Sequence, residues 1–180
     1  MIIQFDDITL RAIEESDLEL IREMINDPEI EKMTGGGGFP VSAYQQKRWF
    51  ESIQNRNNEL RLMIDTNNHG TIGLVALTDI DYKNGTAEFH YKLASSKNLR
   101  GKGYGTKALS ALVEYAFMQM NLNCIYSGNV EYNNVTERIK EKLGFKKEGV
   151  LRERVFKNGK YFNIHVWSLL RSDWVKANQK

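Results

Sequence analysis

A glycine-rich segment in the second half of the chain constrains the fold more than any other feature. Gly101, Gly103 and Gly105 alternate between a strand-like run at 88–93 and an apolar-periodic helix expected over about 106–120. Glycine lets a backbone turn tightly and approach a ligand closely, and a helix N-terminus adds unpaired N–H groups and a positive dipole end. Such a strand–loop–helix unit can bind a phosphate or pyrophosphate, and Arg100 and Lys102 add positive charge there.

Neither of the two best-known phosphate-binding loops matches this segment. The spacing Gly-x-x-x-x-Gly-Lys-Ser/Thr is absent, and in the dinucleotide pattern Gly-x-Gly-x-x-Gly the third glycine would come one residue later. The simplest alternative is a glycine-rich turn that joins a strand to a helix without any ligand. The segment alone leaves both interpretations open.

Composition indicates one folded domain over residues 1–180. The chain has 41% hydrophobic residues, and its 25 basic and 23 acidic residues give a net charge of +2, which is not the footprint of a nucleic-acid-binding protein. Cys124 is the sole cysteine, so no internal disulfide can form, and we expect a buried strand residue there rather than a nucleophile. The N-terminus lacks a signal-peptide pattern, and no apolar run approaches the ~20 residues of a membrane span. We therefore expect a soluble, cytoplasmic protein without membrane or nucleic-acid partners.

Periodicity, caps and turn residues predict the order of the elements. Ser16 and Glu19 form a capping-box pattern for a first helix, and Ser42 can cap a second. Asn84–Gly85 and Asn158–Gly159 are hairpin signals, and Gly144 is a helix C-cap signal. The expected strands cover 9–13, 60–66, 71–80, 86–93, 123–130, 150–156 and 161–170, and the later helices cover about 43–54, 106–120 and 135–143. This order predicts an α+β fold with a mostly antiparallel central sheet flanked by helices.

A second segment, from Asn133 to Gly149, makes the sequence pattern more specific than the glycine-rich segment alone. It reads Asn-x-x-Thr, then a helix, then Lys-Leu-Gly-Phe and Glu-Gly. Together with Arg100, Gly103 and Gly105, which fit the pattern Arg/Gln-x-x-Gly-x-Gly/Ala, it resembles the GNAT family of acetyl-CoA-dependent N-acetyltransferases. The resemblance runs from about residue 8 to 174. It looks closest to the branch that holds ribosomal-protein N-terminal acetyltransferases and spermidine acetyltransferases.

The resemblance implies where the cofactor lies. In the family, the sheet splays open between the strands expected here at 86–93 and 123–130, and the pantetheine arm of acetyl-CoA pairs with the backbone of 91–94 in that opening. Acetyl-CoA is the implied co-substrate, and no metal is implied. For Asn133 the alternative is an N-cap, and for Lys142 a solvated helix position. The expected cofactor-binding residues are Leu93, Ala94, Arg100, Gly101, Lys102, Gly103, Tyr104, Gly105, Thr106, Asn133 and Lys142.

Acetyl transfer to an amine needs a base for the ammonium and a donor for the departing thiolate. Glu88 is the candidate base, with a surface strand glutamate as the alternative. His90 lies two residues on, so it faces the same side of the strand and could share that role. Thr136 falls where relatives have a serine that can protonate or steady the thiolate. Lys140 occupies the position of the family's tyrosine acid, and a proton donor, a surface residue and a phosphate contact all remain open there.

The expected function is transfer of an acetyl group from acetyl-CoA to a primary amine within one ternary complex. The acceptor is either a small molecule, such as a polyamine or an amino sugar, or a protein N-terminus. It would be framed by the first two helices, the loop at 33–41 and the hairpin at 156–163, and the glycines at 35–38 could form a lid. A non-catalytic acyl-CoA-binding or regulatory protein with the same fold is the alternative, favoured by the lysine at position 140. A homodimer is compatible with the resemblance.

Overall fold

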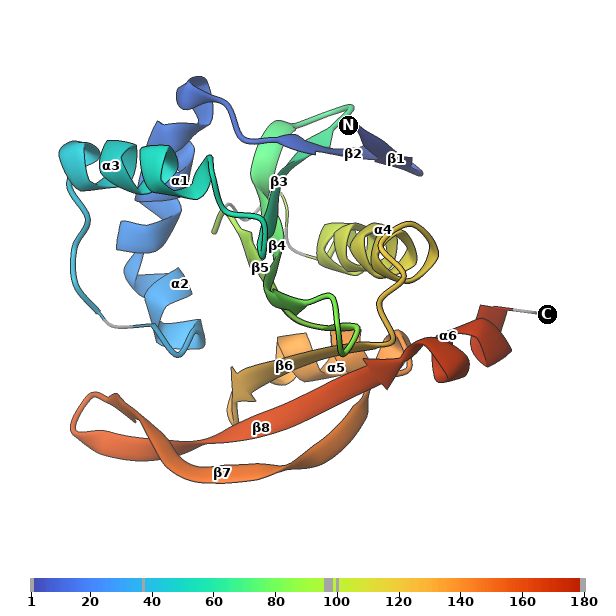
Figure 1. Ribbon diagram of the computed structural model, residues 1–180. Coiled ribbons are helices and arrows are strands. Elements are labelled where there is room, and N and C mark those ends of the chain that lie inside the picture. Colours follow the sequence, from blue (N-terminus) through green and yellow to red (C-terminus); the bar gives the residue numbers. More distant parts are fainter. Residues whose placement is uncertain (1, 37, 96–98, 100, 179–180) are drawn as a thin grey trace.

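The computed structural model describes residues 2–36, 38–95, 99 and 101–178 (Figure 1). Eight described strands form one sheet in the order β1-β2-β3-β4-β5-β6-β8-β7. The strands are β1 (Ile3–Phe5), β2 (Ile8–Ala12), β3 (Leu60–Thr66), β4 (Gly70–Asp81), β5 (Thr86–Leu93), β6 (Cys124–Val130), β7 (Lys146–Lys157) and β8 (Lys160–Leu170). The helices are α1 (Leu18–Asn26), α2 (Pro28–Met33), α3 (Ala43–Ile53), α4 (Tyr104–Met118), α5 (Asn134–Lys142) and α6 (Arg171–Asn178), with a 3-10 turn η1 at Glu15–Asp17.

Helices cover the sheet from both sides. In Figure 1, α1, α2 and α3 lie on one face of β2–β5, and α4 lies on the other. The main core forms where α4 packs on the sheet, and it includes Leu109, Leu112 and Phe117, which are all inaccessible to solvent. A smaller cluster of Ile21, Met24 and their neighbours joins α1 and α3 to the opposite face. The predicted α+β class with a mostly antiparallel sheet is therefore confirmed.

The sheet opens in the middle. β5 and β6 are the one parallel pair among the described strands, and their pairing covers Thr86–Cys124, Ala87–Ile125 and Glu88–Tyr126 only. β5 then continues along β4, whereas β6 continues along β8. Beyond Glu88 and Tyr126 the two strands therefore diverge, as the family resemblance implies.

The N-terminal region differs most from the expected elements. β1 pairs with β2 across a tight turn in which Asp6 has a positive φ of 55°, and the sequence analysis missed this short strand. The expected cap at Ser16 is wrong: Glu14 and Asp17 make the capping box, and α1 begins at Leu18. Pro28 lies just past the end of α1 and starts α2, a short helix that the sequence analysis missed, because Asp27 caps a new helix there. The C-terminal α6 was also missed.

An ion-pair cluster around Asp17 ties the start of α1 to the sheet. Arg11 on β2 donates hydrogen bonds to both carboxylate oxygens of Asp17 at 2.7 and 2.9 Å, and to Asp65 on β3 at 2.6 Å. The Arg11 guanidinium holds the pKa of Asp17 below its usual range. Charged Asp17 therefore stabilises the fold above its unfolded-state pKa, and this contribution is lost as the pH falls through the lower, folded-state value.

Arg11→Met should lower the free energy of unfolding by about 2 kcal/mol at pH 7, since a charge-assisted bidentate pair is lost and Asp17 stays buried. The difference from the wild type should shrink as the pH falls below the usual carboxylate range and through the lowered pKa of Asp17. Urea titrations of the wild type and the variant, at pH 7 and at acidic pH, measure this difference in the free energy of unfolding. Arg22→Met, which removes a more exposed pair with Glu19, should cost less than about 0.5 kcal/mol. Equal losses for the two variants would contradict the assignment.

Candidate active site

The glycine loop leads into a helix N-terminus that is ready for an anion. Gly101 and Gly103 have φ of 77° and 79°, a region that side chains disfavour, and Gly103 is the N-cap of α4. The Lys107 N–H donates to the Gly103 carbonyl at 3.0 Å. The N–H groups of the preceding turn, from Tyr104 to Thr106, are therefore the ones that a helix leaves for a ligand. The site fits a pyrophosphate, and Arg100 lies outside the described residues.

Close packing places this loop beside the opening in the sheet. An added Cβ on Gly105 would lie 3.3 Å from Ile139 on α5, and 3.5 and 3.6 Å from Leu93 and Tyr91 on β5. The first turn of α4 therefore touches both the strand and the helix that border the opening. Leu93 is partly buried in the core, and the Ala94 N–H donates to Ile72 on β4. The expected cofactor-binding backbone of 91–94 thus runs from the opening toward the loop.

The tip of the β3–β4 hairpin also reaches the loop, which the sequence analysis did not foresee. Lys102 Nζ lies 3.0 Å from His69 Nε2, and the His69 ring meets the edge of Tyr104 at 5.9 Å between centroids. Tyr104 itself is buried in the core, so it can offer a ligand only its backbone. Lys102 is exposed and stands where its charge can reach a phosphate at the helix N-terminus.

Glu88 lies at the point where the strands part. Its backbone faces Thr78 on β4 and Tyr126 on β6, and a bulge interrupts β4 immediately after Thr78. His90 Nε2 is 2.9 Å from Thr78 Oγ1 and 3.6 Å from the Glu88 carboxylate. Burial lowers the pKa of His90, and the Glu88 charge opposes this shift. The two expected catalytic side chains therefore lie together, on the face covered by α1–α3.

Thr136 and Asn133 lie on the opposite side of the opening. The Thr136 hydroxyl is 2.9 Å from the phenol oxygen of Tyr91, so a hydrogen bond joins α5 to β5 across the divergence. Asn133 caps α5 by accepting from the Thr136 N–H at 3.2 Å, and its amide donates to the Met33 carbonyl at 2.9 Å. The N-cap role of Asn133 is thus present, and its predicted contact with the pantetheine arm stays a prediction.

Lys140 has surroundings that the sequence did not indicate. Its side chain is 0% exposed, so the surface interpretation is wrong. Its amine donates to Asn129 Oδ1 on β6 at 2.8 Å and lies 5.5 and 5.9 Å from the ring centroids of Phe89 and Trp167. Burial lowers the pKa of Lys140 to about 7, against the opposing charges of Glu137 and Glu88. A stripe of apolar residues around position 140 would have indicated in the sequence that Lys140 is buried. Its partners Asn129 and Trp167 instead come from strands that are distant along the chain, so the sequence carries no local signal of them.

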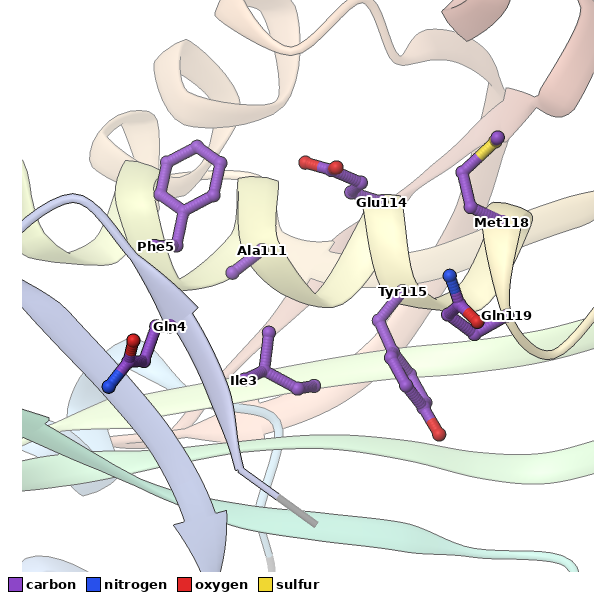
Figure 2. A pocket seen from close by; sticks show the side chains of 8 residues that line it. All are labelled: Ile3, Gln4, Phe5, Ala111, Glu114, Tyr115, Met118 and Gln119. Carbon is purple, nitrogen blue, oxygen red and sulfur yellow. The ribbon is translucent and has the colours of Figure 1, made fainter.

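Two other features lie apart from this arrangement. Lys142 is exposed at the C-terminal end of α5, more than two turns from Asn133, and its predicted phosphate contact stays a prediction. A groove of about 170 Å³ runs between β1 and the second half of α4, lined by residues such as Phe5, Glu114 and Met118 (Figure 2). The glycine loop is at the other end of α4, so this groove is not part of the site.

The end of α2 bridges the two parts of the sheet that diverge at the opening, the arm formed by β2–β5 and the arm formed by β6–β8. Tyr132 and Asn133, which follow β6, donate to the carbonyls of Lys32 and Met33 at 2.6 and 2.9 Å. Lys157 at the end of β7 donates to the Glu31 carbonyl at 2.9 Å and forms an ion pair with its carboxylate. The long β7–β8 hairpin reaches under α2 in Figure 1. These contacts close one side of the opening.

Comparisons with known proteins agree with this geometry. The family model described as an acetyltransferase (GNAT) domain matches residues 7–146. The chain is 30% identical to the prophage-derived uncharacterized N-acetyltransferase YokL of Bacillus subtilis, covering 94% of this chain and 93% of that protein. It is 29% identical to the spermidine N(1)-acetyltransferase of Vibrio cholerae, with 96% of this chain and 98% of that protein covered.

A solved structure extends the likeness to the fold. The Vibrio cholerae spermidine N-acetyltransferase, crystallised with CoA and spermine, superposes with a TM-score of 0.87 at 28% identity. The match covers 94% of this chain and 98% of that one. The shared fold therefore includes both arms of the sheet and the helices that border the opening.

Proposed function

We propose a function from one premise: this chain belongs to the GNAT acetyltransferase family. Acetyl transfer from acetyl-CoA to an amine is the activity of that family, and the glycine loop and the divergent strands fit it. Our finer proposal is that the acceptor is a small molecule with more than one primary amine, of the polyamine class. Transfer takes place directly, with acceptor and acetyl-CoA bound together.

The chain's own groups divide the chemistry between the two faces of the sheet. The loop and the first turn of α4 hold the pyrophosphate, so the thioester extends into the opening. Glu88, with His90 beside it, takes the proton of the acceptor ammonium, whose pKa in solution is about 10.4. Thr136 and Tyr91 offer hydroxyl groups on the far side, where the thiolate leaves. Holding both substrates in the opening supplies much of the rate.

The closure by α2 supports a small-molecule acceptor. A polypeptide N-terminus needs an open groove for the residues that follow it, whereas Tyr132, Asn133 and Lys157 tie α2 to the opposite arm. The similar spermidine N-acetyltransferase with bound spermine supports the same class. This closure is the observation on which the proposal mainly rests.

Thiol release from acetyl-CoA tests the proposal with four groups of acceptors: polyamines, amino sugars, aminoglycosides and short peptides with free N-termini. We expect kcat/KM for spermidine or spermine to exceed that for any peptide by at least about tenfold. A peptide preference would overturn the small-molecule acceptor. CoA binding by calorimetry without thiol release for any amine would instead favour a non-catalytic acyl-CoA-binding protein.

Lys157→Met tests the bridge itself. The change removes the ammonium that holds Glu31, so the end of α2 should loosen and KM for the amine should rise about fivefold, a loss of about 1 kcal/mol. KM for acetyl-CoA should not change, because the loop is elsewhere. Lys147→Met, which changes an exposed lysine near the start of the same strand, is the matched control. Equal amine KM values for the two variants would contradict a role for the bridge.

A further inference from the structure

The tip of the β3–β4 hairpin is held in a defined position beside the glycine loop. Thr66 is buried at the end of β3, and its hydroxyl accepts from the His69 N–H at 2.9 Å and donates to the Gly70 carbonyl at 3.2 Å. The Asn67 N–H donates to the Asp7 carbonyl at 3.2 Å, so the neighbouring β1–β2 turn supports the tip as well. Backbone hydrogen bonds and a buried hydroxyl therefore determine where His69 lies.

The His69 imidazole contacts two residues of the segment that leads into α4. Its ring meets the edge of the Tyr104 ring, with 5.9 Å between the centroids and 79° between the planes. Its Nε2 is 3.0 Å from Lys102 Nζ. An ammonium group can only donate, so the ring nitrogen accepts this hydrogen bond. Because Tyr104 is buried in the first turn of α4, His69 sets the position of the Lys102 ammonium relative to the helix N-terminus.

A neutral acceptor leaves the charge of Lys102 available for a ligand. Lys107, the other lysine close to the first turn of α4, pairs with the carboxylates of Asp6 at 2.8 Å and Asp7 at 2.5 Å. Among the residues that the structure describes, no carboxylate pairs with Lys102, whose partner is the imidazole. A phosphate competes with carboxylates for the same ammonium protons. Of these two lysines, Lys102 is therefore the one that can bind an anion without first breaking an ion pair.

We propose that His69 is a positioning residue for the cofactor, which holds the Lys102 ammonium where it binds a phosphate group of CoA. The inference rests on the proposed function, since it takes the glycine loop as the place where the cofactor's phosphates bind. A long lysine side chain loses conformational freedom when it binds a ligand, and the contact with His69 removes part of that freedom beforehand. The benefit is therefore expected in the affinity for the cofactor and not in the chemical step.

Titration calorimetry with CoA tests this role at about pH 8, where an imidazole is neutral and an alkylammonium is charged. Lys102→Met should raise the Kd about tenfold, as expected for the loss of one charge-assisted contact. His69→Phe keeps a ring against Tyr104 but removes the acceptor, so it should raise the Kd about threefold. In the Lys102→Met background, His69→Phe should cause no further loss, because the imidazole acts through the ammonium.

Two control variants separate positioning from a general disturbance of the hairpin. His69→Gln keeps a side-chain acceptor, so it should bind CoA as the wild type does. Asn68→Ala changes another exposed residue of the same tip and should also leave the Kd unchanged. In steady state, His69→Phe should raise KM for acetyl-CoA while kcat and KM for spermidine stay at their wild-type values.

The same titrations with 3′-dephospho-CoA identify which phosphate Lys102 binds. Equal losses for CoA and 3′-dephospho-CoA would support the inference with the diphosphate as the ligand, and a loss confined to CoA would support it with the 3′-phosphate. Wild-type affinity in His69→Phe, or an equal loss from this change in the wild-type and Lys102→Met backgrounds, would overturn the inference alone. A wild type that does not bind CoA would overturn the proposed function as well.

Discussion

Gly103→Val should raise the dissociation constant for CoA about 100-fold while the protein still folds. Gly103 has a φ of 79° at the N-cap of α4, and a β-branched residue there costs at least about 1–2 kcal/mol or forces the loop to move. A shifted loop no longer directs the N–H groups of the first turn at one point, so the pyrophosphate loses several hydrogen bonds together. Titration calorimetry with CoA measures the affinity, and urea unfolding measures the stability.

The chain offers a matched control for backbone strain. Gly159, at the tip of the β7–β8 hairpin, has a φ of 77°, and like Gly103 it has nothing within 4 Å of an added Cβ. Gly159→Val should therefore cost similar stability and leave the CoA affinity unchanged. If both variants bind CoA as the wild type does, the glycine loop is not the cofactor site.

Glu88→Gln should lower kcat/KM about 100-fold near pH 7, the contribution typical of a positioned general base. The amide keeps the size of the side chain but cannot accept the proton of the ammonium. The loss should shrink as the pH approaches the acceptor pKa of about 10.4, where the amine is already neutral. Rates with a fixed diamine between pH 6 and about pH 10 measure this dependence.

Asp79→Asn is the control that distinguishes the loss of a proton acceptor from the loss of a nearby negative charge. Asp79 lies in the β4 bulge with a φ of 48°, a conformation that asparagine adopts readily, and its charge influences the neighbouring His90. Asp79→Asn should change the acceptor KM modestly and leave the shape of the pH profile unaltered. A Glu88→Gln profile parallel to that of the wild type would reject Glu88 as the base.

The regular elements were predictable because their signals are local. Ser42 caps α3, Gly144 adopts the expected positive φ after α5, and the strands from β3 to β6 lie within one residue of their predicted bounds. The N-terminal cap differs because the Asp17 carboxylate accepts from the Glu14 N–H and from Arg11, so the capping box begins two residues before Ser16. Short elements such as β1 carry too few residues for a periodic signal.

The site was predictable in its backbone but not in its buried contacts. The glycine loop and the position of Glu88 follow from sequence order, because the turn and the strand are contiguous. The environment of Lys140 depends on Asn129 from β6 and Trp167 from β8, whose meeting requires the complete sheet. The same holds for the bridge between Lys157 and Glu31, which are 126 residues apart.

In the described part of the chain, no helix is both long and apolar enough to cross a bilayer.

Initial rates measured while both acetyl-CoA and spermidine are varied test the central claim most directly. Direct transfer between substrates that meet in the opening predicts double-reciprocal lines that intersect, with thiol release and acetylated amine formed in equal amounts. Parallel lines would indicate an acyl-enzyme intermediate and would contradict the account.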